Sequence, residues 1–245
     1  MHRQPPEGIS PGRQQVHALI PAAGRGTRFG GAVLKQYLPI QGKAVLAHSI
    51  RAFQFHPQIS GITVVLAEDD QWFESAVGTL ASSVTTVTGG DTRAQSVRNG
   101  LQFIADNHPD TDWVLVHDGA RPCLSALCLD RLLEQGLASP FGAVLAMPVS
   151  DTLKSADEEN QIVGTVDRSG LWAAQTPQLF PVRTLAEAID TAQREGCELT
   201  DESSAMEFVG IKPKLVMGSV SNIKITYPVD LSIAEALLKR KDQTS

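Results

Sequence analysis

Short apolar runs alternate along this chain with longer segments in which apolar residues recur every three or four positions. Apolar runs of this length predict buried strands, and the longer periodic segments predict amphipathic helices. The expected strands span residues 16–22, 61–67, 84–88, 113–117 and 142–149. The expected helices span residues 45–55, 70–81, 92–106 and 125–137, and Asp69 or Asp70 is the expected N-cap of the second. This βαβα order predicts a largely parallel sheet that is covered by helices on both faces.

The alternation stops between residues 150 and 173. There, the run Asp-Glu-Glu-Asn at 157–160 indicates the tip of a hairpin between two short extended pieces. Further helices are expected at 181–194, with Pro181 as the first helical residue, and at 228–240, and short strands at 214–217 and 223–226. The pattern therefore predicts one Rossmann-like α/β domain with a mixed, mostly parallel sheet and a projecting β-arm at about 150–173.

Length and charge narrow the class of protein. The 245 residues carry a net charge of −6 and are 42% hydrophobic, which suits one large domain with a substantial core. The acidic balance disfavours a general nucleic-acid-binding protein, because such proteins usually carry a basic patch. No apolar run approaches the roughly 18 residues of a membrane-spanning helix. We therefore expect neither a nucleic-acid partner nor a membrane partner.

Two further features bear on location. Residues 1–15 contain no apolar segment of a secretory signal, and their Pro, Gly and Gln content predicts a flexible tail. The three cysteines, Cys123, Cys128 and Cys197, are odd in number and lack the spacing of zinc ligands. Neither a disulfide framework nor a zinc site is favoured, and a cytoplasmic location is expected.

A glycine-rich loop follows the first expected strand directly. Residues 21–36 read PAAGRGTRFGGAVLKQ. Glycines such as Gly24 and Gly26 allow positive φ and a close approach to a ligand. Exposed N–H groups in such a loop form a concavity that binds anions, and Arg25, Arg28 and Lys35 add positive charge. The loop therefore predicts a phosphate-binding site, with an ordinary strand-to-helix turn as the alternative on spacing alone.

Two common glycine loops do not fit this segment. A dinucleotide-binding loop needs a third glycine where Phe29 stands, and an acidic residue about 20 positions further on. A Walker A loop needs Gly-Lys-Ser or Gly-Lys-Thr, but Gly42-Lys43 is followed by Ala44. The phosphate compound must therefore be inferred from the rest of the chain.

Polar motifs follow four of the expected strands. They occupy residues 24–28, 89–93, 117–122 and 151–154. Ligands of open α/β sheets bind outside the carboxyl ends of the strands. We therefore expect these motifs to meet at one edge of the sheet and to form a binding site there.

The ordered set of motifs resembles the 2-C-methyl-D-erythritol 4-phosphate cytidylyltransferases of non-mevalonate isoprenoid synthesis. The matching residues are PAAGxGxR at 21–28, KQY at 35–37, GGDxRxxS at 89–96, HDxARP at 117–122, DT at 151–152, DRxxLW at 167–172, QTPQ at 175–178, TDE at 200–202 and NIK at 222–224. The first motif is shared loosely with many sugar nucleotidyltransferases, but the ordered set is much more specific. The resemblance covers about residues 16–238.

The resemblance implies a nucleotidyltransferase domain at residues 16–240, with a short tail at 241–245. It implies a reaction of CTP with a sugar-alcohol phosphate that gives a CDP-alcohol and pyrophosphate. By resemblance, Arg28 and Lys35 are the catalytic cations, for which solvated loop charge is the alternative. The nucleotide contacts implied by the family are Pro21, Ala22, Ala23, Gly24, Gly26, Gly90, Asp91 and Ser96. For Ser96, simple exposure on a helix stays open.

The resemblance also implies a metal site and a second substrate pocket. Asp118 is the best candidate to orient Mg²⁺, because magnesium often takes one carboxylate together with substrate phosphates; capping of the next turn is the alternative. The residues implied to bind the second substrate are Thr152, Arg168, Thr176, Lys224 and Arg121. In the family, Thr152 and Arg168 reach the site of the neighbouring subunit, which implies a homodimer through the β-arm. Asp201 and Glu202 fit either the wall of the site or a helix N-terminus.

One residue departs from the family pattern, and two other functions remain open. Leu34 stands where proline usually precedes the catalytic-type lysine, so the loop is expected to be less rigid around Lys35. A close relative acting on another polyol phosphate, such as ribitol 5-phosphate, would share the whole CTP half of the site. A nucleotide-binding sensor without turnover would not need the cations that stabilise a transition state.

Overall fold

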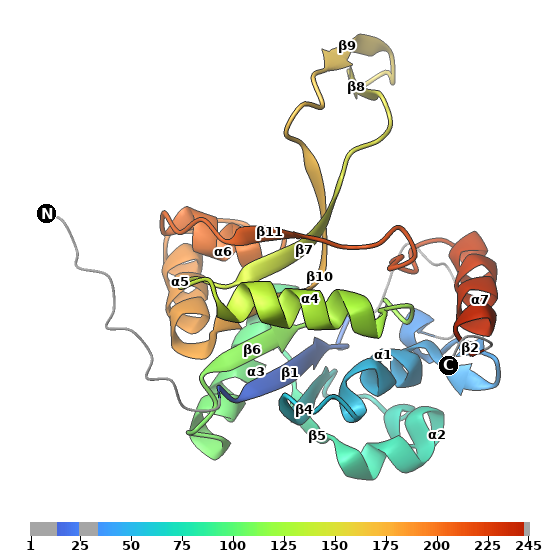
Figure 1. Ribbon diagram of the computed structural model, residues 1–245, viewed down its shortest axis with the longest axis vertical. Coiled ribbons are helices and arrows are strands. Elements are labelled where there is room, and N and C mark those ends of the chain that lie inside the picture. The colour runs from blue at the N-terminus through green and yellow to red at the C-terminus, as the bar shows by residue number, and fades with distance from the viewer. Residues whose placement is uncertain (1–13, 25–33, 243–245) are drawn as a thin grey trace, which may run out of the picture.

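The computed structural model describes residues 14–24 and 34–242. Its centre is a seven-stranded sheet with the strand order β11-β7-β10-β6-β1-β4-β5 (Figure 1). These strands are β1 (Val16–Pro21), β4 (Ile59–Leu66), β5 (Thr85–Thr88), β6 (Trp113–Val116), β7 (Ala143–Pro148), β10 (Trp172–Pro181) and β11 (Lys214–Met217). Neighbouring strands are parallel except where β10 pairs with β6 and β7. The predicted mixed, mostly parallel α/β fold is therefore confirmed.

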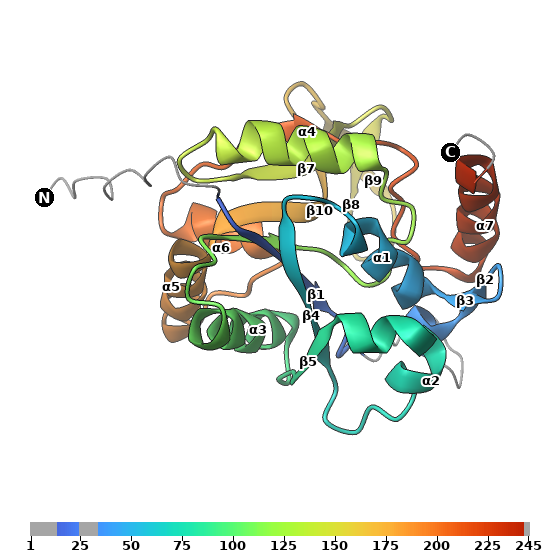
Figure 2. The ribbon, with the colours of Figure 1, turned by 60° about the horizontal axis from the view of Figure 1, so that its bottom comes forward.

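Helices cover both faces of the sheet (Figure 2). One face carries α1 (Val45–Gln54), α2 (Phe73–Val77) and α4 (Ala126–Leu137), and the other carries α3 (Arg93–Asn107), α5 (Val182–Arg194) and α6 (Glu202–Phe208). Side chains of a strand point alternately to the two faces. Along β1, Ala18 and Ile20 therefore pack with α1 and α4, whereas Leu19 packs with α3 and α5. The continuous apolar runs in the sequence reflect this burial on both sides.

The antiparallel strand β10 was not predicted by the apolar pattern. Its residues 172–181 include Gln175, Pro177 and Gln178, and proline within a run argues against an interior strand. The pairing of β10 with β7 is irregular between Ala174 and Gln178, so Pro177 lies outside the regular ladder. The strand forms because β6 and β7 provide hydrogen-bonding partners on both of its sides.

The helix expected at 70–81 is shorter than predicted. α2 ends at Val77 and a 3-10 helix, η3 (Gly78–Ser83), follows, because Gly78 adopts a positive φ of 63° that interrupts the α-helix. The helix also begins later than predicted, at Phe73 with Trp72 as its N-cap, so the prediction of Asp69 or Asp70 as the N-cap is wrong, although Asp70 still contacts the first turn. The carboxylate of Asp70 accepts hydrogen bonds of 3.0 Å from the N–H groups of Trp72 and Phe73.

Residues 223–226 do not form the predicted strand. The N–H of Ile225 donates to the carbonyl of Ala120, and its side chain is buried among Ile40, Val45 and Cys123. This apolar cluster also receives α7 (Pro228–Asp242), beside the small hairpin of β2 (Pro39–Ile40) and β3 (Lys43–Ala44). The segment is held by the packing of its apolar side chains instead of a strand partner.

The predicted hairpin between 150 and 173 is confirmed. β8 (Leu153–Ala156) and β9 (Ile162–Val166) form a separate two-stranded sheet that projects from the central sheet (Figure 1). At its tip, the carboxylate of Asp157 accepts from the N–H groups of Glu159 and Gln161. We call residues 150–171 the arm.

The N-termini of α5 and α6 lie close to the predicted positions. Pro181 is the N-cap of α5, and the helix begins at Val182, one residue after the expected start. Asp201 caps α6 in a capping box with Ser204, which confirms N-capping as its structural role. Within residues 14–24 and 34–242, no helix is long and apolar enough to cross a membrane.

Two buried histidines, His17 and His117, should make the stability of the fold sensitive to acid. Burial lowers the pKa of His17, on β1, to about 4, with a further contribution from His108, and burial lowers the pKa of His117 to about 4 as well. Both are neutral in the fold, whereas the unfolded chain takes up protons below about pH 6.5. The free energy of unfolding should therefore fall as the pH drops from about 6.5 to about 4, by on the order of 3 kcal/mol for each histidine.

Urea denaturation of the wild type and of His17→Gln between pH 7 and pH 5 tests this expectation. The variant should lose less stability on acidification than the wild type. His56→Gln is the matched control, because it removes a histidine that contacts Asp130 at the surface. Parallel pH profiles for the wild type and His17→Gln would contradict the assignment.

Candidate active site

A cavity of about 830 Å³ opens at the carboxyl ends of β1, β4, β5 and β6. It is lined by Pro21, Ala22, Ala23, Gly24, Lys35, Gln36, Ala67, Glu68, Asp69, Gly89, Gly90, Asp91, Thr92, Arg93, Ser96, Asp118, Gly119, Ala120 and Lys224. Its volume falls within the range of small-molecule sites. The cavity therefore brings together motifs that are separated by up to two hundred residues in the sequence.

Most of the predicted site residues lie in this cavity. Those that line it are Pro21, Ala22, Ala23, Gly24, Lys35, Gly90, Asp91, Ser96, Asp118 and Lys224. Gly26 and Arg28 lie outside the described residues. Thr152 and Arg168 are exposed on the arm and do not line the cavity. Thr176 and Arg121 do not line the cavity, but both contact Asp118.

The first loop is held by a short helix that carries the predicted lysine. In η2 (Lys35–Tyr37), the amide of Gln36 donates to the carbonyls of Ala22 (2.9 Å) and Gly24 (3.2 Å). The hydroxyl of Tyr37 donates to Asp70 at 2.5 Å. Lys35 lines the cavity, and its Nζ donates to the carbonyl of Ile225 at 3.2 Å. The Lys-Gln-Tyr motif therefore places one cation in the cavity and fixes the loop beside it.

The second loop leaves no space for a side chain at Gly89. A Cβ atom on Gly89 would lie 2.7 Å from Ser96 Oγ and 2.8 Å from Ala23 Cβ. The hydroxyl of Ser96 accepts from the N–H of Gly90 at 3.1 Å, and Ser96 is 3% exposed. The alternative interpretation, that Ser96 is merely exposed on a helix, is therefore wrong. The serine holds the glycine turn against the start of α3, where the side chain of Thr92 forms the N-cap.

Asp118 lies among three cations. Its Oδ2 is 2.9 Å from Lys224 Nζ and 3.5 Å from Arg121 Nε, and its Oδ1 is 3.2 Å from Arg93 Nη2. Burial alone would raise the pKa of Asp118, but the charges of Arg93 and Lys224 outweigh it and hold the pKa well below its usual range. The carboxylate is therefore ionised at neutral pH and faces the cavity.

Thr176 holds the backbone of Asp118, and Asn222 in turn holds Thr176. The buried hydroxyl of Thr176 accepts from the N–H of Asp118 at 3.0 Å and contacts Nδ1 of His117 at 3.1 Å. Asn222 is fully buried, and its side-chain amide donates to the backbone carbonyl of Thr176. The backbone carbonyl of Asn222 accepts from Arg121 at 2.7 Å. Thr176 therefore orients Asp118 and does not line the cavity, and its contact with the second substrate stays a prediction.

The chain is similar to one family of enzymes along most of its length. The sequence model of the 2-C-methyl-D-erythritol 4-phosphate cytidylyltransferase family matches residues 16–240. The chain belongs to this family. A relative of that name from Dechloromonas aromatica is 47% identical over 227 residues, which is 92% of this chain and 98% of the relative. One from Vibrio parahaemolyticus is 46% identical, over 91% of this chain and 95% of the relative.

Solved structures of the family share the fold. The crystal structure of a 4-diphosphocytidyl-2C-methyl-D-erythritol synthase is 42% identical with a TM-score of 0.80, and covers 92% of this chain and 99% of its own. The cytidylyltransferase from Francisella tularensis is 34% identical with a TM-score of 0.79, over 91% and 100% of the two chains.

Arg93, Gln36 and Asn222 at this cytidylyltransferase-family site were not predicted as site residues, and Glu202 was predicted only as part of the site wall or of a helix N-terminus. Arg93 and Glu202 appear in the sequence motifs, but nothing in the sequence indicates that they form an ion pair. Nη1 of Arg93 is 2.6 Å from Oε1 of Glu202. Burial alone would lower the pKa of Arg93, but Glu202 and Asp118 raise it by more. Gln36 and Asn222 also lie in the sequence motifs. In the structure, both are polar and yet buried, which distinguishes them from the other polar residues of the motifs that lie at the surface.

The donor set at Asp118 suits a magnesium ion that is shared with phosphates. Within the described part of the chain, no group of three or more His, Cys, Asp or Glu side chains could hold a metal by itself. Magnesium often takes one carboxylate plus substrate phosphates and water. The ionised carboxylate of Asp118 at the cavity wall fits this role, and the side chain of Lys224, which is 42% exposed, is the neighbour that a bound ion would displace from Oδ2.

Proposed function

We propose that this protein transfers the cytidylyl group of CTP to 2-C-methyl-D-erythritol 4-phosphate. A phosphate oxygen of the acceptor attacks the α-phosphorus of CTP in line. The bond from this phosphorus to the oxygen that bridges to the β-phosphorus breaks, and pyrophosphate leaves. The observation that carries the proposal is the cavity in which the glycine loops and Lys35 face Asp118 and Lys224, in a chain that belongs to this family.

The two reactants are anions, so the protein must position them and offset their repulsion. Lys35 lies where its ammonium can reach phosphate oxygens above the first loop. We assign the same role to Arg28 from the family motif. Backbone groups of Ala22, Ala23 and Gly90 are placed to hold the nucleotide. No covalent intermediate with the protein is required.

Asp91 and Ser96 are the residues that we assign to nucleotide selection and placement. Asp91 lines the cavity at the turn before α3, and a hydrogen-bond acceptor there would take the amino group of cytosine. UTP carries an oxygen at this position and cannot donate a hydrogen bond. Ser96 shapes the adjacent glycine turn, so it acts on the same end of the nucleotide. CTP is therefore the expected substrate.

We propose that Asp118 holds Mg²⁺ together with the triphosphate. The ion supplies positive charge to the α-phosphate and to the leaving pyrophosphate. Asp118 is kept ionised and oriented by its contacts with Arg93 and with the hydroxyl of Thr176. Lys224 and Arg121 lie on the other side of this carboxylate and are the cations that we assign to the phosphate of the second substrate.

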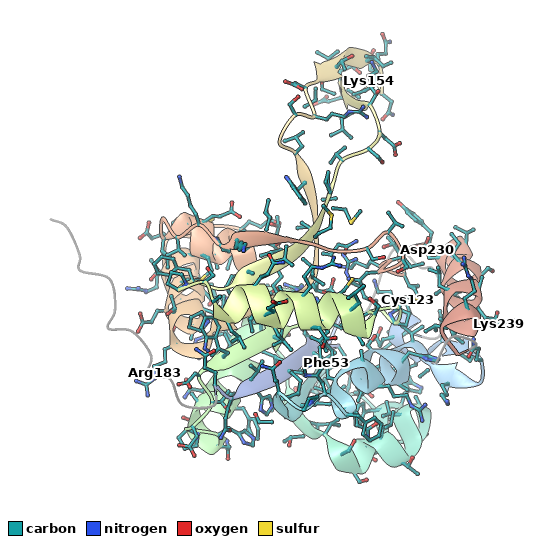
Figure 3. The ribbon with its side chains drawn as sticks, in the orientation of Figure 1. Phe53, Cys123, Lys154, Arg183, Asp230 and Lys239 are labelled. Atoms are coloured by element: carbon teal, nitrogen blue, oxygen red, sulfur yellow. The ribbon has the colours of Figure 1, made fainter. Side chains whose placement is uncertain are left out.

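We also propose that two copies form a dimer through the arm. Ile162 and Val163 are 68% and 69% exposed on the projecting β9, although both are apolar and β-branched. Contact with a second copy would remove this surface from water. Thr152 directly precedes β8 and Arg168 follows β9, and Figure 3 shows Lys154 of β8 away from the central sheet. The arm would bring Thr152 and Arg168 to the partner's cavity.

A cytoplasmic location stays a prediction from the cysteine spacing.

Pyrophosphate release tests the proposed function. With Mg²⁺ present, the expected result is release that requires both CTP and 2-C-methyl-D-erythritol 4-phosphate, and little release when UTP replaces CTP. Parallel reactions with ribitol 5-phosphate test the acceptor. Preference for ribitol 5-phosphate would overturn the acceptor while keeping the nucleotide half. Tight CTP binding without release from either acceptor would indicate a nucleotide sensor.

A further inference from the structure

A buried carboxylate, that of Glu202, lies behind the cavity: it does not line the cavity, but it contacts the cavity-lining Arg93. Glu202 is the first residue of α6 and is 2% exposed. A buried charge is costly unless it is paired and hydrogen-bonded. Its partner is Arg93, whose Nη1 and Nη2 lie 2.6 Å and 3.0 Å from the two carboxylate oxygens. This is a two-point contact, which fixes the plane of the guanidinium.

Arg93 links this buried carboxylate to the cavity. It is the first residue of α3 and lines the cavity. The same Nη2 that contacts Glu202 also donates to Oδ1 of Asp118 at 3.2 Å. Asp118 therefore presents Oδ1 to Arg93 and Oδ2 to Lys224.

The position of Glu202 is itself held by the central sheet. The neighbouring Asp201 accepts from the N–H of Ser204 at 2.9 Å and from the side chain of Gln178 at 2.8 Å. Gln178 lies on β10, and its amide oxygen accepts from the N–H of Ser203 at 2.9 Å. An unbroken series of contacts therefore runs from β10 through the start of α6 and Arg93 to Asp118.

We infer that Glu202 is a positioning residue for the reaction: it holds Arg93 so that only one N–H group reaches Asp118. A free guanidinium would pair with both oxygens of Asp118, because a carboxylate accepts a two-point contact from arginine. Glu202 competes for that edge of Arg93 and so keeps Arg93 away from Oδ2 of Asp118, the oxygen that contacts the cavity-lining Lys224. The inference rests on the proposed role of Asp118 with Mg²⁺ and CTP.

The test compares Glu202→Gln with Glu202→Asp and with the control Glu207→Gln, which alters an exposed residue of the same helix. Calorimetry measures CTP binding with and without Mg²⁺, and kinetics measure the Mg²⁺ dependence of turnover. We expect Glu202→Gln to weaken Mg²⁺-dependent CTP binding and to raise the Mg²⁺ requirement by about 10–100-fold, as for other groups that orient metal ligands. CTP binding without Mg²⁺ should be unchanged, and Glu202→Asp should restore part of the loss.

A purely structural role gives a different result. It would lower the Tm and weaken CTP binding equally with and without Mg²⁺, and that outcome would overturn the inference. The variant Arg93→Gln/Glu202→Gln removes both charges and covers the case in which Glu202→Gln alone does not fold. Because no guanidinium then remains to take Oδ2 of Asp118, we expect the Mg²⁺ requirement of this double variant to stay within about 10-fold of the wild type, and a larger increase would contradict the inference.

The same data separate this inference from the proposed function. Wild-type protein that binds CTP with Mg²⁺ but releases no pyrophosphate would overturn the proposed function, and calorimetry on the variants would still decide the role of Glu202. Normal turnover by the wild type, with unchanged Mg²⁺ dependence in Glu202→Gln, would overturn this inference alone.

Discussion

Replacing Lys35 by alanine is expected to lower kcat by about 10²–10³-fold, the usual effect of removing one group that stabilises a transition state. The lysine lines the cavity next to the first glycine loop, and its ammonium is the group that we assign to the α-phosphate and the leaving pyrophosphate. Because the charge would act mainly in the transition state, KM for CTP should change much less than kcat. Steady-state kinetics of pyrophosphate release measure both constants. Arg28→Ala is expected to behave in the same way.

Lys43→Ala is the matched control for this experiment. Lys43 is an exposed lysine on β3, eight positions further along the chain, and it does not line the cavity. The Lys43→Ala substitution should leave kcat unchanged. Lys35→Arg keeps the charge but replaces a compact ammonium by a planar fork, so an intermediate kcat is expected. A Lys35→Ala enzyme with nearly full turnover would refute the catalytic assignment.

Arg168→Ala is expected to reduce kcat/KM for the acceptor by about 10–100-fold, the effect of losing one hydrogen bond to a charged group. Arg168 is part of the arm, which projects from the central sheet (Figure 1), and it does not line the cavity of its own subunit, so we expect it to complete the partner's site. Co-expression of Lys35→Ala and Arg168→Ala chains should then restore activity. A mixed dimer has one intact site, formed by the unaltered Lys35 of one chain and the unaltered Arg168 of the other.

Random mixing should restore about a quarter of wild-type activity, because half of the dimers are mixed and each has one intact site of two. Separate affinity tags on the two chains allow the mixed dimer to be purified and assayed by itself. Lys154→Ala, another change on the arm, is the control and should keep full activity as a homodimer. If Arg168 served the site of its own subunit, both sites of the mixed dimer would be damaged, and absence of restored activity would contradict the shared site.

Local sequence patterns predicted most of the fold. β1, α1, β4, α3, β6, α4 and β7 lie where apolar runs and helical periodicity place them, because residues buried on both sides of a strand or on one side of a helix must be apolar. The hairpin of the arm was recognised from its polar tip at 157–160. Local patterns failed where packing between distant segments dominates.

Two segments show this limit clearly. β10 contains Gln175, Pro177 and Gln178, which are unusual for an interior strand, yet β6 and β7 leave unpaired backbone groups between them that only a strand can satisfy. Residues 223–226 read as a strand, but Ile225 packs beneath α7 and no strand forms there. Both outcomes depend on neighbours that local sequence does not specify.

By itself, the sequence determined the α/β architecture, the glycine loops and the residues at the strand ends, because the chemistry of each is local to a short motif. Only the tertiary structure decided how those motifs contact one another. Arg93 and Glu202 are separated by 109 positions, and Asp118 meets Lys224 and Arg93 from different parts of the fold. The energy of a buried charge depends on the partners that folding brings within hydrogen-bonding distance. Those partners, and with them the ionised state and orientation of Asp118, are properties of the folded chain.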